Sequence, residues 1–360
     1  MNRLLQGDVG SGKTAVAAAL CYSAIKNGYQ AAIMAPTEIL AEQHYRTIMK
    51  LFTGCGITVH LLTGSTTARE KKIIKVQLLS GEVSLIIGTH ALIEDTVEFH
   101  NLGLVVTDEQ HRFGVAQRSA LNEKGDNPHL LIMSATPIPR TLALIIYGDL
   151  DVSVLDEMPP GRQKIDTYSV GSSYRPRIYG YIKKHLDEGR QGYIVCPLVE
   201  EGETELIAAQ EYSEMLKVGA FKGYSVGLLH GKMKGREKEQ TMRRFASGEL
   251  QLLVATTVVE VGVDVPNAVI MVIENAERFG LSQLHQLRGR VGRGEHKSSC
   301  ILISDSEGEV AQQRLDIMKA TNDGFLIADK DLALRGPGDF FGKRQHGLPE
   351  LKIARPIDRR

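Results

Sequence analysis

The sequence predicts an α/β protein of two consecutive domains, each built on a parallel sheet. Short apolar runs alternate with helical patterns in two series, and the proline-glycine stretch DEMPPGRQKID at 156–166 separates them. A phosphate-binding pattern, G-x-x-x-x-G-K-T, stands at Gly7–Thr14, where a strand should meet a helix. With 360 residues, 42% hydrophobic and 24% charged, the chain is long enough for two cores.

The first series predicts strands joined by helices. Leu4 and Leu5 can end a buried strand before the phosphate-binding pattern. Further apolar runs lie at 30–36, 57–63, 83–89, 102–109 and 129–136, and helical patterns lie at Ala15–Lys26, Glu38–Phe52 and Arg69–Leu79. Since such alternation is typical of crossover connections, we expect a parallel sheet covered on both faces.

The second series predicts a second α/β domain, with strands at 192–197, 224–231, 250–257, 267–274 and 298–304. It contains no phosphate-binding pattern. If it duplicates the first domain, it therefore has a different task. The segment from Arg314 to Gly347 reads as helical and then rich in glycine and charge, and residues 355–360 are expected to be a disordered tail.

Composition narrows the class of protein only partly. Lys+Arg and Asp+Glu are 43 each, so net charge neither supports nor excludes a nucleic acid. The four cysteines are far apart without a C-x-x-C pair, which argues against a disulfide framework or a structural zinc site. No run approaches the ~20 apolar residues of a membrane span, and no leader precedes the phosphate loop. We expect a cytoplasmic protein with no membrane partner.

The phosphate-binding pattern assigns a role to each part of the loop. Its glycines let backbone N–H groups close around phosphate oxygens, Lys13 reaches the outer phosphates, and the Thr14 hydroxyl holds Mg²⁺. The alternative is a glycine-rich turn with a surface lysine. The predicted nucleotide-binding residues are Gly7, Asp8, Val9, Gly10, Ser11, Gly12, Lys13 and Thr14.

Two carboxylates end the apolar run LGLVV of the first series. Open α/β sheets bind ligands at the carboxyl ends of their strands, where Asp108 would hold the metal. Glu109 would orient and deprotonate the attacking water. Alone, this pair would be a solvated turn, but a phosphate-binding loop in the same domain favours the catalytic interpretation.

Five segments of the first domain resemble, in order and spacing, motifs of superfamily 2 helicases: APTEILAEQ (35–43), TGS (63–65), GTHALI (88–93), DEQH (108–111) and SAT (134–136). In the second domain ATTVVEVGVDVPNA (255–268) resembles motif V. Hydroxyls and backbone N–H groups at such places can hold a phosphate backbone without reading bases. Each alone would be a capping or turn motif. The DNA-binding residues implied are Thr37, Thr63, Gly64, Thr89 and Thr257.

HQLRGRVGRG (285–294) resembles motif VI of the same superfamily. Arg290 and Arg293 can project from one helical face towards the γ-phosphate of ATP and act as arginine fingers, with Gln286 on the same side of the site. The alternative is a solvated basic helix face. The resemblance implies two tandem RecA-like (P-loop NTPase) domains with ATP between them, and it implies that Gln110, His111, Ser134, Thr136 and Asp264 couple hydrolysis to domain motion.

The segment 314–347 resembles the translocation motif shared by the RecG family and the transcription-repair coupling factor Mfd, with matches at Arg314, Arg335 and Gln345. A helical hairpin followed by a loop is expected there; the alternative is a domain-capping helix with solvated arginines. LDEMPPGRQKI (155–165), IVCPLVEEGETEL (194–206) and Gln110 favour the RecG family over Mfd. The boundaries implied are 1–156 and 157–310 for the RecA-like domains, 311–354 for the hairpin and loop, and 355–360 for the tail.

The resemblance predicts an ATP-dependent helicase that translocates on double-stranded DNA. It would use ATP and Mg²⁺ to remodel branched DNA, such as stalled forks and Holliday junctions, in recombination and repair. Single-stranded DNA-binding protein is a further partner implied, and we expect a monomer. The family carries an amino-terminal wedge domain, which we expect to be missing before Met1. Two alternatives stay open: an Mfd-like translocase, or a truncated fragment that binds nucleotide or DNA without coupling them.

Overall fold

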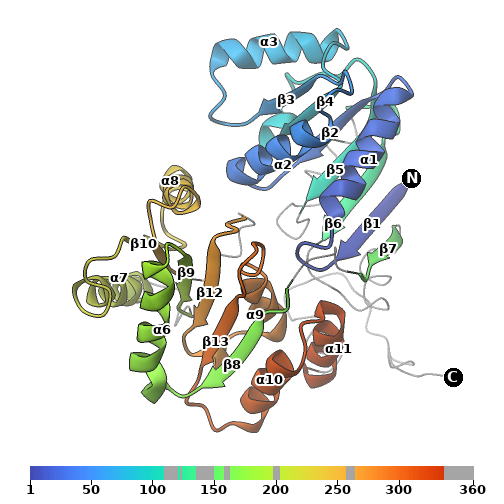
Figure 1. The fold of residues 1–360 in the computed structure, drawn as a ribbon. Helices are drawn as coiled ribbons and strands as arrows, with labels where there is room; N and C mark the ends of the chain where they lie inside the picture. The colour runs from blue at the N-terminus through green and yellow to red at the C-terminus, as the bar shows by residue number, and fades with distance from the viewer. Residues whose placement is uncertain are drawn as a thin grey trace, which may run out of the picture.

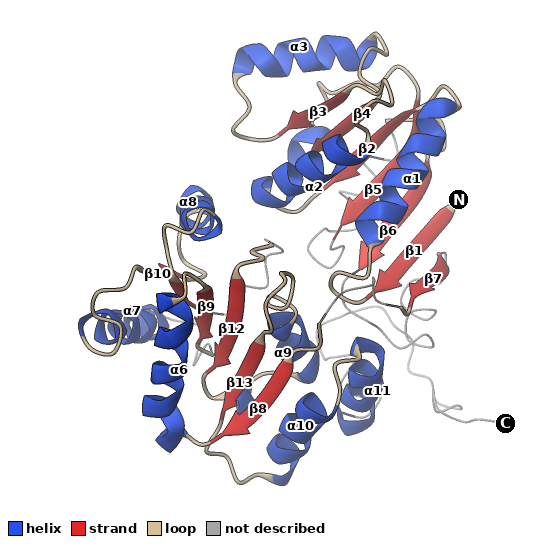
Figure 2. Ribbon diagram, in the orientation of Figure 1, coloured by secondary structure: helices blue, strands red, loops and turns tan. Residues whose placement is uncertain are grey.

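The computed structural model describes residues 1–108, 121, 124–134, 150–157, 163–197, 203–256 and 264–335, with the backbone alone for residues 203–208 and 335. Two α/β units, each with a sheet whose strands all pair in parallel, follow one another along the chain (Figures 1 and 2). The predicted fold class of two tandem RecA-like units is confirmed.

The first sheet has the order β3-β4-β2-β5-β6-β1-β7. Its strands are β1 (Asn2–Gly7), β2 (Gln30–Met34), β3 (Val59–Leu62), β4 (Leu85–Gly88), β5 (Leu102–Asp108), β6 (His129–Ser134) and β7 (Asp151–Leu155), and its helices are α1 (Lys13–Lys26), α2 (Glu38–Leu51), α3 (Ala68–Leu79) and the short η1 (His90–Ile93). Alternate residues of β2 enter two different cores: Ile33 packs on one face of the sheet, and Met34 packs on the other. The sheet is therefore buried on both faces, as its nearly continuous apolar strands predict.

The second sheet has the order β10-β11-β9-β12-β13-β8. Its strands are β8 (Asp166–Val170), β9 (Gln191–Val195), β10 (Val226–Leu229), β11 (Leu252–Ala255), β12 (Ala268–Ile273) and β13 (Ser299–Ile303), and its helices are η3 (Ser172–Tyr174), α6 (Arg175–Asp187), α7 (Glu203–Val218), α8 (Gly235–Ala246), η5 (Ala276–Arg278) and α9 (Leu281–Arg288). Helices α10 (Glu309–Ala320) and α11 (Gly324–Arg335) follow and pack beside α9 at the β8 edge (Figure 1). Among the described helices, none combines the length and apolarity that crossing a membrane requires.

Two strands, β7 and β8, were not predicted from the sequence. Both lie at the edge of their sheet, and each contains exposed or half-exposed positions such as Val154 and Tyr168. An edge strand needs few apolar residues because one side of it faces solvent, so it lacks the apolar run that marks a central strand.

The two units share one strand topology, as expected for an internal duplication. Both sheets list equivalent strands in the same order, from β3 or β10 at one edge to β1 or β8 near the other. The duplication is also visible in the sequence, because residues 61–89 align without a gap on residues 228–256. The shared pieces are Leu61-Leu62 with Leu228-Leu229, Arg69-Glu70-Lys71 with Arg236-Glu237-Lys238, and Ser80-Gly81-Glu82 with Ser247-Gly248-Glu249.

A buried glutamine makes equivalent hydrogen bonds in the two units. Gln30 begins β2 and donates from Nε2 to the carbonyl oxygens of Leu78 and Val83, at 2.9 and 2.7 Å. In the second unit Gln191 begins β9 and donates to the carbonyl oxygens of Phe245 and Leu250, at 2.6 and 2.7 Å, which are the aligned positions. Each glutamine satisfies one carbonyl in the last turn of α3 or α8 and one in the segment that follows, and so fixes that helix to its sheet.

Replacing Gln191 with leucine is expected to lower the free energy of unfolding by about 1–3 kcal/mol, because the buried carbonyls of Phe245 and Leu250 lose their donor. Urea unfolding followed by circular dichroism measures the change. The exposed Gln240 of α8 provides the matched control, for which Gln240→Leu should change stability by less than about 0.5 kcal/mol. Equal losses in both variants would contradict the bridging role.

Candidate ATP and DNA sites

The predicted phosphate loop connects the end of β1 to the start of α1. Gly12 is the N-cap of α1 and has φ 95°, a left-handed conformation that side chains disfavour, and Gly10 has φ 77°. The loop therefore needs glycine at these two positions to turn its backbone N–H groups towards the helix N-terminus. Such an arrangement binds phosphate through N–H groups and the helix dipole.

Lys13 and Thr14 lie in the first turn of α1. The ammonium group of the buried Lys13 donates to the carbonyl oxygens of Gly7 and Asp8, both at 2.8 Å, and so lies within the loop. Thr14 is half-buried. The lysine position is the one that the pattern requires for reaching the outer phosphates.

Asp108 is the last residue of β5 and ends at the same carboxyl edge of the sheet. Its Oδ2 lies 2.8 Å from Nε2 of His44 on α2, and both side chains are largely buried. His44 was not predicted, because a histidine within a helical pattern carries no sign of its partner. It fixes one oxygen of the carboxylate that is the candidate metal ligand.

The candidate DNA-binding residues of the first domain lie at strand ends and helix starts. Thr37 is the N-cap of α2, where its hydroxyl accepts from Leu40 N at 3.4 Å. Thr63 and Gly64 follow β3, and the buried Thr89 follows β4. Glu38, which was not predicted, joins two of these places: its Oε1 accepts from Ser65 N at 3.0 Å, and a Cβ on Gly64 would lie 2.7 Å from the same oxygen. Glu38 therefore links the TGS turn to α2, and a side chain at position 64 would displace the Glu38 carboxylate.

The duplication reveals a counterpart of the TGS turn in the second domain. Residues 63–67 align with residues 230–234 between β10 and α8, which carry the exposed Lys232 and Lys234. Equivalent bonds close both turns: Thr66 N donates to Thr63 O, and Met233 N donates to His230 O, each at 3.3 Å. Residues 230–234 were missed because a strand-end turn has no helicase signature of its own, yet the internal repeat would have found them.

Motif VI lies at the end of α9 and in the turn behind it. The predicted single helical face for Arg290 and Arg293 is wrong: α9 ends at Arg288, Gly289 is its C-cap, and Gly292 has φ 78°. The helix ends before Arg290, and Gly292 supplies a left-handed residue in the turn behind it, so both arginines project from a turn. Arg290 is buried, Gln286 on α9 is half-buried, and Arg293 donates to Gly289 O at 3.1 Å and lies 3.4 Å from Asp264.

The two domains meet along α2 and α8. Arg243 of α8 forms an ion pair with Glu42 of α2, and the backbone N–H of Asp264 donates to Gln43 Oε1 at 3.0 Å. Burial and then the nearby Glu38 carboxylate raise the pKa of Glu239 on α8. Asp264, predicted to couple the domains, therefore contacts both the first domain and Arg293.

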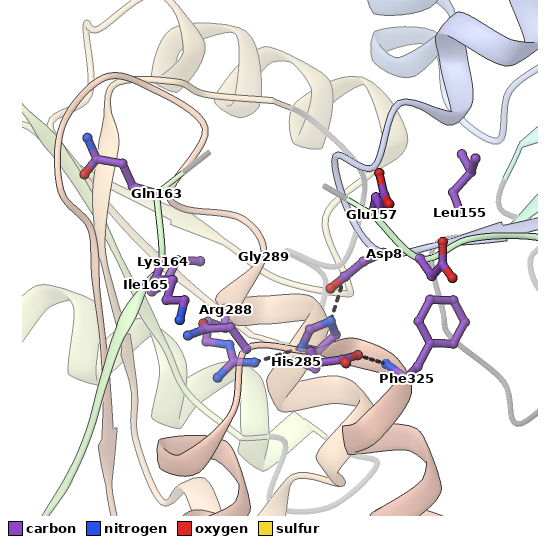
Figure 3. A pocket seen from close by; sticks show the side chains of 13 residues that line it. Asp8, Leu155, Glu157, Gln163, Lys164, Ile165, His285, Arg288, Gly289 and Phe325 are labelled. Carbon is purple, nitrogen blue, oxygen red and sulfur yellow. Dashed lines mark hydrogen bonds and ion pairs between the residues drawn. The ribbon is translucent and has the colours of Figure 1, made fainter. Parts of the chain in front are cut away.

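A second contact joins the phosphate loop to motif VI. Asp8 Oδ1 lies 2.7 Å from Nε2 of His285 on α9, with both side chains buried (Figure 3). A Cβ on Gly289 would lie 3.2 Å from the Val9 side chain, so the glycine permits this close approach. A cavity of about 310 Å³ lies beside the contact, lined by residues of both domains including Asp8, His285 and Arg288. His285 and Arg288 were not singled out from the sequence.

Several predicted site residues lie outside the described residues: Glu109, Gln110, His111, Thr136, Thr257 and Gln345. Ser134 is buried at the end of β6. In the C-terminal hairpin, Arg314 on α10 donates towards the carbonyl oxygens of Glu277 and Phe279, at 3.4 and 3.5 Å. Arg335 ends α11, where the backbone alone is described.

Family models cover most of the chain. Residues 1–145 match the DEAD/DEAH box helicase model, and residues 177–295 match the helicase conserved C-terminal domain. Residues 321–359 match the model described as ATP-dependent DNA helicase RecG, domain 3, C-terminal. The first two matches carry the phosphate loop and motif VI, respectively.

Similar proteins include the ATP-dependent DNA helicase RecG of Bacillus subtilis, 57% identical over 98% of this chain and 52% of the relative. The RecG of Thermotoga maritima is 52% identical over 98% of this chain and 46% of its own length. The chain thus spans about half the length of the curated relatives it matches.

Solved structures agree with these relatives. The structure of RecG bound to a three-way DNA junction has a TM-score of 0.84 and 48% identity, covering 97% of this chain and 45% of that one. Dbp5 of S. cerevisiae bound to RNA and ADP BeF3 is 18% identical, with a TM-score of 0.65 over 93% of this chain and 88% of that one, and shares the fold. From its sequence, its paired α/β units and its match to the RecG domain, this chain belongs to the RecG family of superfamily 2 helicases.

Proposed function

We propose that this chain is the motor of an ATP-dependent DNA helicase that translocates on double-stranded DNA and remodels branched DNA. The observation that carries this proposal is the meeting of the phosphate loop with motif VI across two domains, through Asp8 and His285 at 2.7 Å. A nucleotide on the loop would contact both domains, so its hydrolysis would change how they sit together. The similar RecG that is bound to a three-way junction supports a branched DNA substrate.

The residues at the site fit ATP and Mg²⁺. A hydroxyl at the start of α1 and a carboxylate at the end of β5 are the hard oxygen ligands that Mg²⁺ prefers, and His44 already orients that carboxylate. When bound, Mg²⁺ would neutralise charge on the phosphates. Thr14 and Asp108 would hold it, Lys13 would bind the outer phosphates, and Glu109 would orient the attacking water. Arg290 and Arg293 would approach the γ-phosphate from the second domain.

We propose that the duplicated turns, 63–67 and 230–234, contact the DNA backbone from the two domains. Their aligned sequence and equivalent hydrogen bonds support a shared role, and the second turn supplies Lys232 and Lys234. The two turns would move relative to each other as the ATP site opens and closes. Contacts of this kind give little base preference and a strong salt dependence.

The salt dependence of DNA binding tests this contact. K232Q and K234Q are each expected to weaken binding to duplexes of any sequence and to reduce the slope of log K against log salt by about 1. Fluorescence anisotropy over a salt series measures the slope. K222Q, at an exposed lysine before β10 and so at the opposite end of that strand, should leave the slope unchanged. Slopes for K232Q and K234Q equal to that of the unsubstituted chain would remove the second turn from the interface.

Strand separation tests the function itself. The chain is expected to unwind a synthetic three-way junction in a reaction that requires ATP and Mg²⁺. We further propose that it acts as a monomer in the cytoplasm, where its DNA substrate lies, and that single-stranded DNA-binding protein is a partner. Failure to unwind or move on any DNA while still hydrolysing ATP would contradict the proposal.

A further inference from the structure

The carboxyl edge of the second sheet carries a buried carboxylate at the place that Asp108 has in the first. Asn101 and Asn267 establish the equivalence, because each donates from Nδ2 to a glycine carbonyl oxygen in front of β2 or β9, at 3.2 and 2.9 Å. Seven residues after each asparagine, β5 ends at Asp108 and β12 is followed by Glu274. Glu274 is therefore the counterpart of the candidate metal ligand.

Each of these carboxylates is held by a side chain from the helix that follows the neighbouring strand. In the first domain His44 on α2 lies 2.8 Å from Asp108. In the second domain Tyr212 on α7 donates to Glu274 Oε1 at 2.7 Å. A hydroxyl has one hydrogen, so Tyr212 accepts from the Tyr179 hydroxyl, 3.1 Å away. Burial, and then the Glu274 carboxylate, raise the pKa of Tyr212, which keeps this hydroxyl a donor.

The two domains differ in the cation that they place beside the carboxylate. Lys13 and Arg175 are the first residues of equivalent helices, α1 after β1 and α6 after β8. Lys13 donates to carbonyl oxygens of its own loop. Arg175 instead donates to the Glu274 carboxylate, from Nη2 to Oε2 at 2.8 Å and from Nε to Oε2 and Oε1 at 3.2 and 3.3 Å. A fixed guanidinium therefore lies on the counterpart of the candidate metal ligand.

An aspartate lies at the loop of the same edge. The segment between β8 and α6 is the counterpart of the phosphate loop, and its Ser172 N–H donates to Asp305 Oδ1 at 2.7 Å. Hydrogen bonds from Ser172, and more weakly the charge of Arg175, lower the pKa of Asp305. The second domain thus places an internal anion where the first has a loop suited to phosphate.

We propose that the second domain contains an internally occupied counterpart of the ATP site, in which Arg175 is a built-in cation on Glu274 and Asp305 is a built-in anion on the loop. These groups hold α6 and α7 to the sheet without any ligand. The alternative is an ordinary surface ion pair, which contributes little. Glu274 is only 4% exposed, however, and a buried carboxylate that loses its partner charge is strongly destabilising.

Chemical rescue of R175A tests whether Arg175 fills a cation site. Amide hydrogen exchange at residues 172–179 and 209–216 is measured on the 360-residue chain, without nucleotide or DNA. Methylguanidinium is added at about 10 mM, far below the concentrations at which guanidinium unfolds proteins. This small planar cation can make the same two-pronged pair with Glu274 that Arg175 makes. R177A is the matched control, because Arg177 is an exposed arginine of the same helix.

R175A is expected to exchange these amides about tenfold or more faster than the unsubstituted chain, and methylguanidinium should return the rates to within about threefold. The unsubstituted chain and R177A should exchange slowly with or without the added cation. Unchanged rates in R175A would overturn the proposal, and so would equal acceleration in R177A or a failure of methylguanidinium to slow exchange in R175A.

A second variant keeps the test decisive if R175A does not fold. E274Q retains the size of the side chain but removes the charge that binds the cation, so exchange should be faster than in the unsubstituted chain and methylguanidinium should not slow it. Unchanged exchange in E274Q would overturn the proposal. Because neither nucleotide nor DNA is present, a failure of DNA-stimulated ATP turnover would sink the proposed function and leave this result standing.

Discussion

Replacing Lys13 with alanine is expected to lower ATP turnover by about 10³-fold or more, because in the proposed site this lysine binds the outer phosphates and the charge that develops on them. The buried ammonium now donates to Gly7 O and Asp8 O at 2.8 Å, so it is already directed into the loop. Steady-state phosphate release with and without DNA measures the effect.

Lys26 at the other end of α1 provides the control for this substitution. It lies in the last turn of the helix and covers the ring of Tyr22 at 5.3 Å, far along the helix from the loop. K26A should retain full turnover. Comparable losses in K13A and K26A would mean that α1 as a whole had been disturbed, and would contradict a special role for Lys13.

Replacing Arg290 with lysine is expected to lower the rate of hydrolysis by about 10³-fold or more while nucleotide affinity changes little, as the loss of an arginine finger does. Arg290 is buried in the turn behind α9, on the domain that contacts the phosphate loop through His285. A lysine retains the charge but loses the planar set of donors. Single-turnover hydrolysis and a nucleotide titration together separate the catalytic effect from binding.

Arg278 in η5 is the matched control, because it is an exposed arginine of the same domain. R278K should hydrolyse ATP at the unsubstituted rate. If R290K loses nucleotide affinity and rate by the same factor, Arg290 serves binding alone, and the finger role is wrong.

The parts of the fold that sequence could predict are those with a strong local signal. Central strands such as β2 and β5 are continuous apolar runs, and their parallel pairing followed from the helices between them. The edge strands β7 and β8 carry no such run, because solvent on one side relaxes the need for apolar residues. The stretch at 156–166 was predicted to be a linker because of its prolines and glycine, and that prediction left out the edge strands at its two ends.

The residues of the candidate site also fall into two groups, those that the sequence predicted and those that it did not. Motif patterns predicted Lys13, Asp108 and Arg290, since each stands at a fixed position in a recognisable segment. The side chains that orient them, such as His44 at 2.8 Å from Asp108 and His285 at 2.7 Å from Asp8, come from distant parts of the chain. Their partners are set by tertiary packing, which a single sequence does not reveal. The repeat of residues 61–89 at 228–256 is different, because it was present in the sequence and needed only comparison of the chain with itself.

The end of α9 shows how glycine changes a helical interpretation. The spacing of Arg290 and Arg293 fits one helical face, yet Gly289 caps the helix and Gly292 adopts φ 78°. A helix ending here lets the backbone turn and brings Val9 of the phosphate loop close to Gly289. Gly289 of motif VI therefore allows the phosphate loop of the first domain to pack closely against the second domain. The positions of Arg290 and Arg293 are set by the turn that follows α9.

The rate of ATP hydrolysis with and without a synthetic three-way DNA junction tests the central claim most directly, namely that one ATP site between two domains drives movement on DNA. The proposed motor predicts that saturating junction DNA raises turnover severalfold, and that K13A abolishes both the basal and the stimulated rate. Equal turnover with and without the junction would contradict the claim and would leave a domain pair that binds nucleotide without coupling it to DNA.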